Sequence, residues 1–212
     1  MSQGFEALLD DRVRVYRGAF APDRARAVFA ELLRDTPWLA VRYENEGRPG
    51  ELPRLTVNYG ERSYDYSGLT FAPLPWTPLL AELRAYAEGL VGQAFNAVIV
   101  QLYRDGRDRV NWHADDNPAV GVDPTIVSLS FGATRRFLLR PKRGGDELAL
   151  ALHSGDVVVM RGDLQHTHVH KLPREPAVTE PRINLTFRAI VGDAPQPRAE
   201  HSSVQVRWPV DE

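Results

Sequence analysis

Two segments in the first half of the chain carry apolar residues at intervals of three and four. The first spans residues 22–34, where Pro22 suits the first turn of a helix. The second spans residues 78–91, with Thr77 as a candidate N-cap and Gly92 as the residue that ends it. The spacing predicts two amphipathic helices that back a sheet. Their apolar positions are Ala25, Val28, Phe29, Leu32, Leu33, Leu79, Leu80, Leu83, Ala87, Leu90 and Val91.

From residue 97 onward the pattern changes to short apolar or alternating runs that are separated by Gly, Pro and Asp. Runs of this kind are typical of strands. Closure into a barrel or a double-sheet jelly roll would keep the number of exposed strand edges small. We therefore expect the C-terminal half to be mostly β. The runs are AVIVQLY, TIVSLSF, RFLLR, ELALAL, DVVVM and INLTFRAIV.

The length and texture of the chain favour one domain. A chain of 212 residues with 43% hydrophobic and 25% charged residues can bury one sizeable core. Residues 54–71 are rich in Tyr, Ser and Gly, which favours strands and loops over helix. After Gly192 the sequence becomes Pro-rich and polar. We expect a single domain over residues 1–192 and a loosely held tail over residues 193–212.

The composition excludes several kinds of chemistry. The chain contains no cysteine, so disulfides, thiolate nucleophiles and thiolate metal sites are ruled out, and any metal must be held by nitrogen and oxygen. No apolar signal-like stretch follows Met1, and no apolar run approaches the length of a membrane span. We expect a cytoplasmic protein without a membrane partner, and a monomer.

The charge of the chain is unevenly distributed. A net charge of −2 gives no global reason to expect a nucleic-acid partner. Residues 135–143, RRFLLRPKR, nevertheless hold five cations and no acid, and RDGRDRV from Arg104 adds three arginines that two aspartates partly offset. These cations are either an ordinary solvated strand rim or a local anion-binding surface.

His113 and Asp115 stand two residues apart, so in extended backbone their side chains project to the same face. A second histidine would complete a 2-His-1-carboxylate facial triad, which leaves positions on Fe(II) open for a cosubstrate and O2. The sequence HTHVH at residues 166–170 offers one. Ordinary explanations also exist: a loop histidine, a turn aspartate, and a solvated or adventitiously metal-binding strand face.

Residues 182–188, RINLTFR, alternate polar and apolar side chains with period two. Arg182 and Arg188 therefore share one face of a strand with Asn184 and Thr186. A buried arginine needs an anionic partner, because the desolvation of an unpaired charge is costly. A dicarboxylate would supply two, each able to accept a bidentate pair of hydrogen bonds. The alternative is an outer face of exposed arginine and threonine.

Five motifs occur in order: NWHADDNP, SLSFGATRRF, HSGDVVVM, HVHKLPRE and PRINLTFR. Together they resemble the AlkB family of nucleic-acid dealkylases, from about Leu52 to Val191. The resemblance is greatest to a branch that acts on DNA and carries a lid with the pattern YGxxxYxYSG, here within about residues 52–72. It implies an α+β, mainly β fold: a double-stranded β-helix (jelly-roll, cupin-like) core backed by the two helices.

The resemblance also implies Fe(II) as the metal and 2-oxoglutarate and O2 as cosubstrates. His113 and Asp115 match the family's HxD motif. His170, two residues before Leu172, matches the distal histidine ligand, which leaves His166 and His168 as bystanders. No protein residue beyond these metal ligands is expected to act as a catalyst or nucleophile.

For 2-oxoglutarate, the resemblance implies that Arg182 binds the distal carboxylate and that Arg188 binds the carboxylate beside the chelating keto group. Asn184 assists, and Tyr103 matches a further cosubstrate contact. Gln101 stands where family members usually have asparagine, and its longer amide can still donate a hydrogen bond.

For the substrate, Tyr66 matches the lid aromatic residue that stacks on a flipped base, and Tyr64 matches a lid residue near the base or its phosphate. Asp116 matches the carboxylate that contacts the exocyclic nitrogen of the base. Arg135 and Arg136, with the neighbouring cations, are expected to hold the phosphate backbone.

The implied activity is oxidative demethylation of N-alkylated bases in DNA, such as 1-methyladenine and 3-methylcytosine. Formaldehyde is released, and 2-oxoglutarate is converted to succinate and CO2. The alternatives are the same chemistry on RNA, on a protein or on a small molecule, and a non-catalytic module that binds damaged nucleic acid.

Overall fold

The computed structural model describes residues 4–45, 48–66, 69–192 and 201–205. Helices are α1 (Pro22–Asp35), α2 (Pro78–Val91) and α3 (Leu164–Thr167), with a 3-10 turn at Pro118–Val120. Strands of the first half are β1 (Glu6–Leu8), β2 (Val13–Tyr16), β3 (Leu39–Asn45), β4 (Arg48–Gly60), β5 (Tyr64–Tyr66) and β6 (Leu69–Phe71). Later strands are β7 (Ala97–Tyr103), β8 (Val110–His113), β9 (Ile126–Gly132), β10 (Arg135–Pro141), β11 (Leu148–Leu152), β12 (Val157–Met160), β13 (His168–Leu172), β14 (Arg182–Arg188) and β15 (His201–Gln205).

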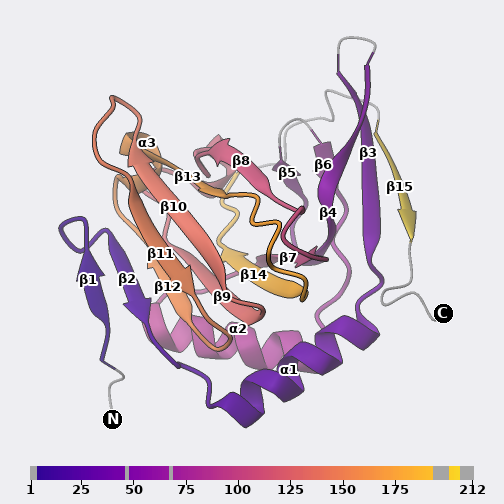
Figure 1. Ribbon diagram of the computed structural model, residues 1–212, viewed down its shortest axis with the longest axis horizontal. Helices are drawn as coiled ribbons and strands as arrows, with labels where there is room; N and C mark the ends of the chain where they lie inside the picture. The colour runs from indigo at the N-terminus through magenta and orange to yellow at the C-terminus, as the bar shows by residue number, and fades with distance from the viewer. Residues whose placement is uncertain (1–3, 46–47, 67–68, 193–200, 206–212) are drawn as a thin grey trace.

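The described strands form two main sheets, a large one in the order β1-β2-β12-β9-β14-β7-β4-β3-β15 and a small one in the order β11-β10-β13-β8. All pairings within these sheets are antiparallel. The small sheet lies across the middle of the large one, and α1 and α2 lie along the opposite side of the large sheet (Figure 1). This is the predicted jelly roll backed by two helices.

Side-chain alternation explains why the large sheet has two different faces. Along β7, β9 and β14, every second residue is a buried apolar side chain that packs with α1 and α2. The intervening residues face the small sheet and are largely polar. The first set comprises Val98, Val100, Leu102, Val127, Leu129, Phe131, Ile183, Leu185 and Phe187, and the second includes Gln101, Tyr103, Ser128, Arg182, Asn184, Thr186 and Arg188.

Both helices form where the sequence predicts them. The Thr77 side chain accepts a hydrogen bond from the backbone N–H of Leu80 at 3.2 Å, and Gly92 ends α2 in the left-handed region at φ 70°. Pro22 begins α1. Among the helices of the described residues, none has the length and apolar character needed to cross a membrane.

The end of the chain differs from the expectation of a loosely held tail at one place. Residues 201–205 form β15, which pairs with β3 from His201↔Tyr43 to Gln205↔Leu39. An unpaired β3 would leave a sheet edge exposed, and backbone hydrogen bonds to a following segment satisfy that edge. The other residues of the predicted tail lie outside the described part of the chain.

Candidate active site

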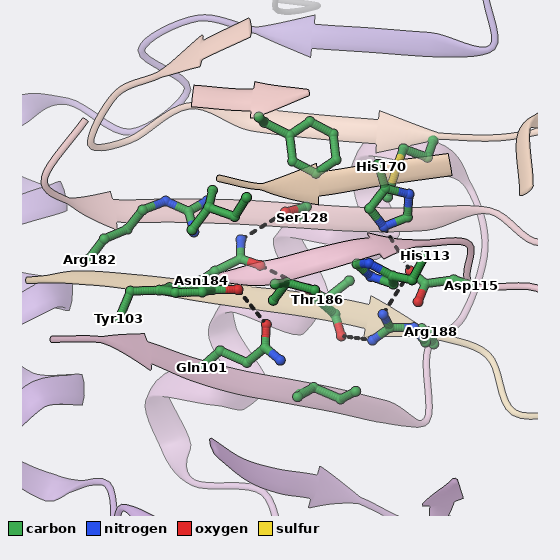
Figure 2. A pocket seen from close by; sticks show the side chains of 15 residues that line it. Gln101, Tyr103, His113, Asp115, Ser128, His170, Arg182, Asn184, Thr186 and Arg188 are labelled. Atoms are coloured by element: carbon green, nitrogen blue, oxygen red, sulfur yellow. Dashed lines mark hydrogen bonds and ion pairs between the residues drawn. The ribbon is translucent and has the colours of Figure 1, made fainter. Parts of the chain in front are cut away.

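Two strands of the small sheet bring the three predicted metal ligands together. His113 ends β8, and it lies directly opposite His170 on β13 in the antiparallel register. Their ring centroids are 4.2 Å apart, and Asp115 follows β8 by two residues. One donor atom from each of the three side chains lies within 4.8 Å of the others. The sequence prediction of a His113, Asp115, His170 cluster is thus confirmed (Figure 2).

The protonation states of these groups suit a cation. Burial lowers the pKa of His170 to about 3, so its imidazole is neutral at pH 7. Nδ1 of His113 lies 2.8 Å from the carbonyl oxygen of Asn111. Because a carbonyl oxygen only accepts, Nδ1 holds the hydrogen, and in the neutral ring Nε2 is the nitrogen that carries the lone pair a metal binds.

Asp115 is held as an anion. Its burial raises the pKa of the carboxyl group, but Arg188 and the two histidines outweigh burial and keep that pKa well below its usual range. Arg188 donates from Nη2 to Oδ2 at 2.9 Å. The other oxygen, Oδ1, is buried without a hydrogen-bond partner among the described residues. A buried anionic oxygen that lacks a donor, beside two neutral imidazoles, is the donor set that a divalent iron needs.

A residue that the sequence patterns missed holds the backbone of the same aspartate. Gln165, on the short helix α3, is 1% exposed, and its side-chain oxygen accepts a hydrogen bond from the backbone N–H of Asp115 at 2.9 Å. Its amide nitrogen lies 3.7 Å from the sulfur of Met160. Gln165 lies in no periodic pattern, so only the tertiary contact reveals its role.

The polar face of β14 extends away from the metal cluster as one wall of the pocket. Arg182 and Tyr103 lie at one end, the metal cluster and Arg188 lie at the other, and Asn184 and Thr186 lie between them (Figure 2). All four alternating β14 positions thus face the pocket, as the period-two pattern predicts. Ser128 is a further polar lining residue, and the polar positions within the apolar run TIVSLSF could have indicated it.

Arg182 is a buried cation with unused hydrogen-bonding capacity. It is 3% exposed, donates from Nη2 to Oγ of Ser130 at 2.9 Å, and has no partner for its Nε within the described residues. Burial lowers its pKa to about 10, so the guanidinium remains charged at neutral pH. Its surroundings therefore fit an anionic group of a ligand.

The neighbouring neutral groups are more fully engaged. The Tyr103 hydroxyl donates to the side-chain oxygen of Gln101 at 2.9 Å, and burial raises the pKa of that hydroxyl. The Asn184 amide nitrogen donates to Ser128 Oγ and to the carbonyl oxygen of Leu129. Asn184 thus lines the pocket, but its N–H groups already bridge β14 to β9.

One predicted substrate contact is wrong. Arg135 is 1% exposed, so it does not offer its charge to a phosphate backbone. Its guanidinium donates to Glu175 Oε2 and to the carbonyl oxygens of Asp105, Asp108 and Pro173. Arg135 is instead a buried cross-link between loops. The sequence could not show this, because burial here depends on segments distant along the chain.

Of the other predicted substrate residues, two lie at the surface and two have side chains outside the described part of the structure. Asp116 is exposed and pairs with Lys142 at 3.0 Å. Arg136 is exposed and pairs with Glu175 at 2.9 Å. Tyr64 and Tyr66 belong to β5, and the placement of their side chains lies outside the described part of the structure.

The two other histidines of HTHVH do not join the cluster found among the described residues. His166 Nε2 lies 3.3 Å from Asp123 Oδ1 at the surface. His168 is largely buried, with Nδ1 2.8 Å from the hydroxyl of Thr167. Both placements agree with their predicted role as bystanders.

Comparison with known proteins agrees with this geometry. The profile of the 2OG-Fe(II) oxygenase superfamily matches residues 12–188. The chain is 41% identical over 187 residues to the alpha-ketoglutarate-dependent dioxygenase alkB homolog 3 of Bos taurus, covering 84% of this chain and 64% of that protein. It is 33% identical over 189 residues to the human DNA oxidative demethylase ALKBH2, covering 83% of this chain and 72% of that protein.

A solved structure of OsALKBH1 has the same fold, with a TM-score of 0.58 and 16% identity over 88% of this chain and 100% of that one. The chain therefore belongs to the AlkB family of 2OG-Fe(II) oxygenases. Its cofactor and cosubstrates are accordingly Fe(II), 2-oxoglutarate and O2, and the His113, Asp115, His170 donor set fits that iron.

Proposed function

We propose that this protein is an Fe(II)- and 2-oxoglutarate-dependent dioxygenase that removes N-methyl groups from bases in DNA, with 1-methyladenine and 3-methylcytosine as the expected lesions. The principal support is one pocket that joins an iron-type donor set to a buried arginine with an unused N–H. The similarity to proteins named as DNA oxidative demethylases supports the choice of substrate.

In this proposal the protein's own residues bind and orient the reactants. Arg182 receives the distal carboxylate of 2-oxoglutarate, because it is a buried cation with a free donor at the far end of the pocket. Tyr103 and Gln101 add neutral contacts beside it, and Asn184 keeps β9 and β14 in register. Arg188 holds Asp115 by a hydrogen bond and lines the same pocket, where it would contact the second carboxylate of 2-oxoglutarate.

Iron held by His113, Asp115 and His170 would supply the oxidation, in which one oxygen atom of O2 would convert 2-oxoglutarate to succinate and CO2 and the other would be inserted into a C–H bond of the methyl group. The resulting N-hydroxymethyl base releases formaldehyde and the unmodified base. The protein needs no nucleophile for this reaction. Its contribution is to orient the methyl carbon and to exclude water, which the apolar walls at Ile99, Phe137 and Leu172 favour.

The base must leave its stack to reach the pocket. Tyr66 is proposed to stack on the flipped base, and Tyr64 to contact the base or its phosphate. Asp116 is proposed to read the exocyclic nitrogen, which requires it to exchange or share its surface contact with Lys142. Arg136 is the remaining candidate of the predicted arginine pair for a phosphate contact.

The test is formaldehyde release from single-stranded and duplex DNA that contains 1-methyladenine or 3-methylcytosine, with Fe(II), ascorbate and 2-oxoglutarate. Release that depends on 2-oxoglutarate and disappears in His113→Ala supports the proposal. If methylated RNA were demethylated and neither form of DNA were, the DNA assignment would be wrong while the oxygenase chemistry would stand.

A further inference from the structure

The outer face of the small sheet has a cluster of cations against one indole ring. Lys171 follows the predicted iron ligand His170 on β13, and Trp112 precedes His113 on β8. Arg140 lies on β10, opposite Val169 of β13. Because neighbouring side chains of a strand point to opposite faces, Lys171 faces away from the pocket that His170 lines.

The contacts within this cluster are close. The guanidinium carbon of Arg140 lies 4.2 Å from the centre of the Trp112 ring, and the ammonium nitrogen of Lys171 lies 4.3 Å from it. Trp112 is partly exposed and Arg140 is exposed, so solvent reaches the cluster. We name the three residues Trp112, Arg140 and Lys171 the aromatic-cation face.

Within the described part of the chain, no acidic side chain neutralises the charge of this face. Nearby cations have acidic partners: Arg136 pairs with Glu175, and Lys142 pairs with Asp116. Across the described residues, by contrast, no ion pair is found for Arg140 or Lys171. Two cations against one ring repel each other, and a bound anion would offset that repulsion.

We propose that the aromatic-cation face binds the phosphodiester backbone of the DNA strand beside the base held in the pocket. This inference rests on the proposed function. Two cations next to a partly exposed aromatic ring suit single-stranded nucleic acid, since cations hold phosphates and the ring can contact a base or sugar. The run of cations without an acid at residues 135–143 fits this proposal through Arg140, which is exposed. Arg135 of the same run is buried and cannot hold a phosphate.

Position supports the same partner. The aromatic-cation face shares β8 and β13 with the metal ligands, so a DNA strand bound to this face lies across the small sheet from the metal site. The Lys142–Asp116 pair joins the turn after β10 to the loop that carries Asp115. Cations thus continue from the outer face to the rim of the site.

The test compares the double variant Arg140→Gln/Lys171→Gln with a matched control, Arg26→Gln/Arg34→Gln. The control also removes two exposed cations, but from α1 on the far side of the large sheet. Binding of a fluorescent single-stranded oligonucleotide with one 1-methyladenine is measured over a salt series. Turnover is measured on that oligonucleotide and on 1-methyl-dAMP, which has no flanking phosphodiester.

The test variant should bind the oligonucleotide about tenfold or more weakly at low salt. Its slope of log K against log salt should fall by roughly 1.4, since each single-strand phosphate contact contributes about 0.7. Turnover of 1-methyl-dAMP should be unchanged, and the control should match the parent protein. The charge-conserving variant Arg140→Lys/Lys171→Arg should recover most of the binding, which separates charge from folding.

An unchanged salt slope in the double variant would overturn the proposal, as would an equal loss of turnover on 1-methyl-dAMP. A stronger effect on binding of an acidic peptide than of the oligonucleotide would also overturn it and assign the face to a protein partner. Failure of the proposed function looks different: the parent protein would then release no formaldehyde from either substrate, whatever the variants bind.

Discussion

The contact between Gln165 and Asp115 gives the sharpest prediction of how this fold supports its metal site. In Gln165→Leu the side chain keeps a similar volume but loses the oxygen that accepts the Asp115 backbone N–H at 2.9 Å. Gln165 is 1% exposed, so water cannot replace that acceptor. A buried donor left without a partner costs about 1–3 kcal/mol in the free energy of unfolding.

The metal affinity should fall as well. Asp115 lies beyond the end of β8, and among its described contacts Gln165 holds the backbone while Arg188 holds the carboxylate. Loss of one support lets the ligand move relative to His113 and His170. Changes to groups that orient metal ligands typically weaken metal binding by about 10–100-fold.

The assay is a calorimetric titration with Mn(II) as an oxygen-stable substitute for Fe(II), together with urea unfolding of the metal-free protein. Leu164→Ala is the control, because Leu164 is a buried neighbour in the same helix that packs in the apolar cluster between the sheets. It should cost about 2–5 kcal/mol of stability and leave metal affinity unchanged. If Gln165→Leu bound Mn(II) as tightly as the parent protein did, the supporting role would be refuted.

Three further predictions concern the pocket and its loops. Arg182→Gln should weaken 2-oxoglutarate binding by about 10–100-fold, because one or two charged hydrogen bonds are lost. Calorimetry should show an unchanged affinity for Mn(II), and an equal loss of affinity for 2-oxoglutarate and Mn(II) would contradict a cosubstrate role. His170→Ala should abolish metal binding while His168→Ala keeps most of it, and a metal-competent His170 variant would refute the ligand assignment. Burial raises the pKa of Glu175, but hydrogen bonds from Arg136 and Arg135 outweigh this and lower it from 4.5. Its contribution to stability is therefore fully present above the ordinary pKa of 4.5 and is lost as the pH falls through the lower pKa of the folded state. The free energy of urea unfolding should differ less between pH 7 and pH 4 in Glu175→Gln than in the parent protein; an unchanged difference would count against this linkage.

The sequence by itself determined the features that depend on neighbouring residues. Period-two alternation in RINLTFR placed Arg182 and Arg188 on the polar face of β14 because strand geometry leaves no other choice. Helical spacing and capping residues located α1 and α2 to within a residue at each end. Spacing along a strand placed His113 and Asp115 on one face, and the resemblance of the ordered motifs to the AlkB family selected His170 within HTHVH.

Only the tertiary structure decided the features that depend on packing between distant segments. Arg135 and Arg136 are adjacent in sequence, yet one is buried among carbonyl oxygens of two loops and the other is exposed. Gln165 became a support for Asp115 because the fold brings α3 beside the loop that follows β8, although the two residues are fifty positions apart in the chain. Burial and hydrogen bonding are set by which surfaces meet in three dimensions, and residue type constrains that only weakly.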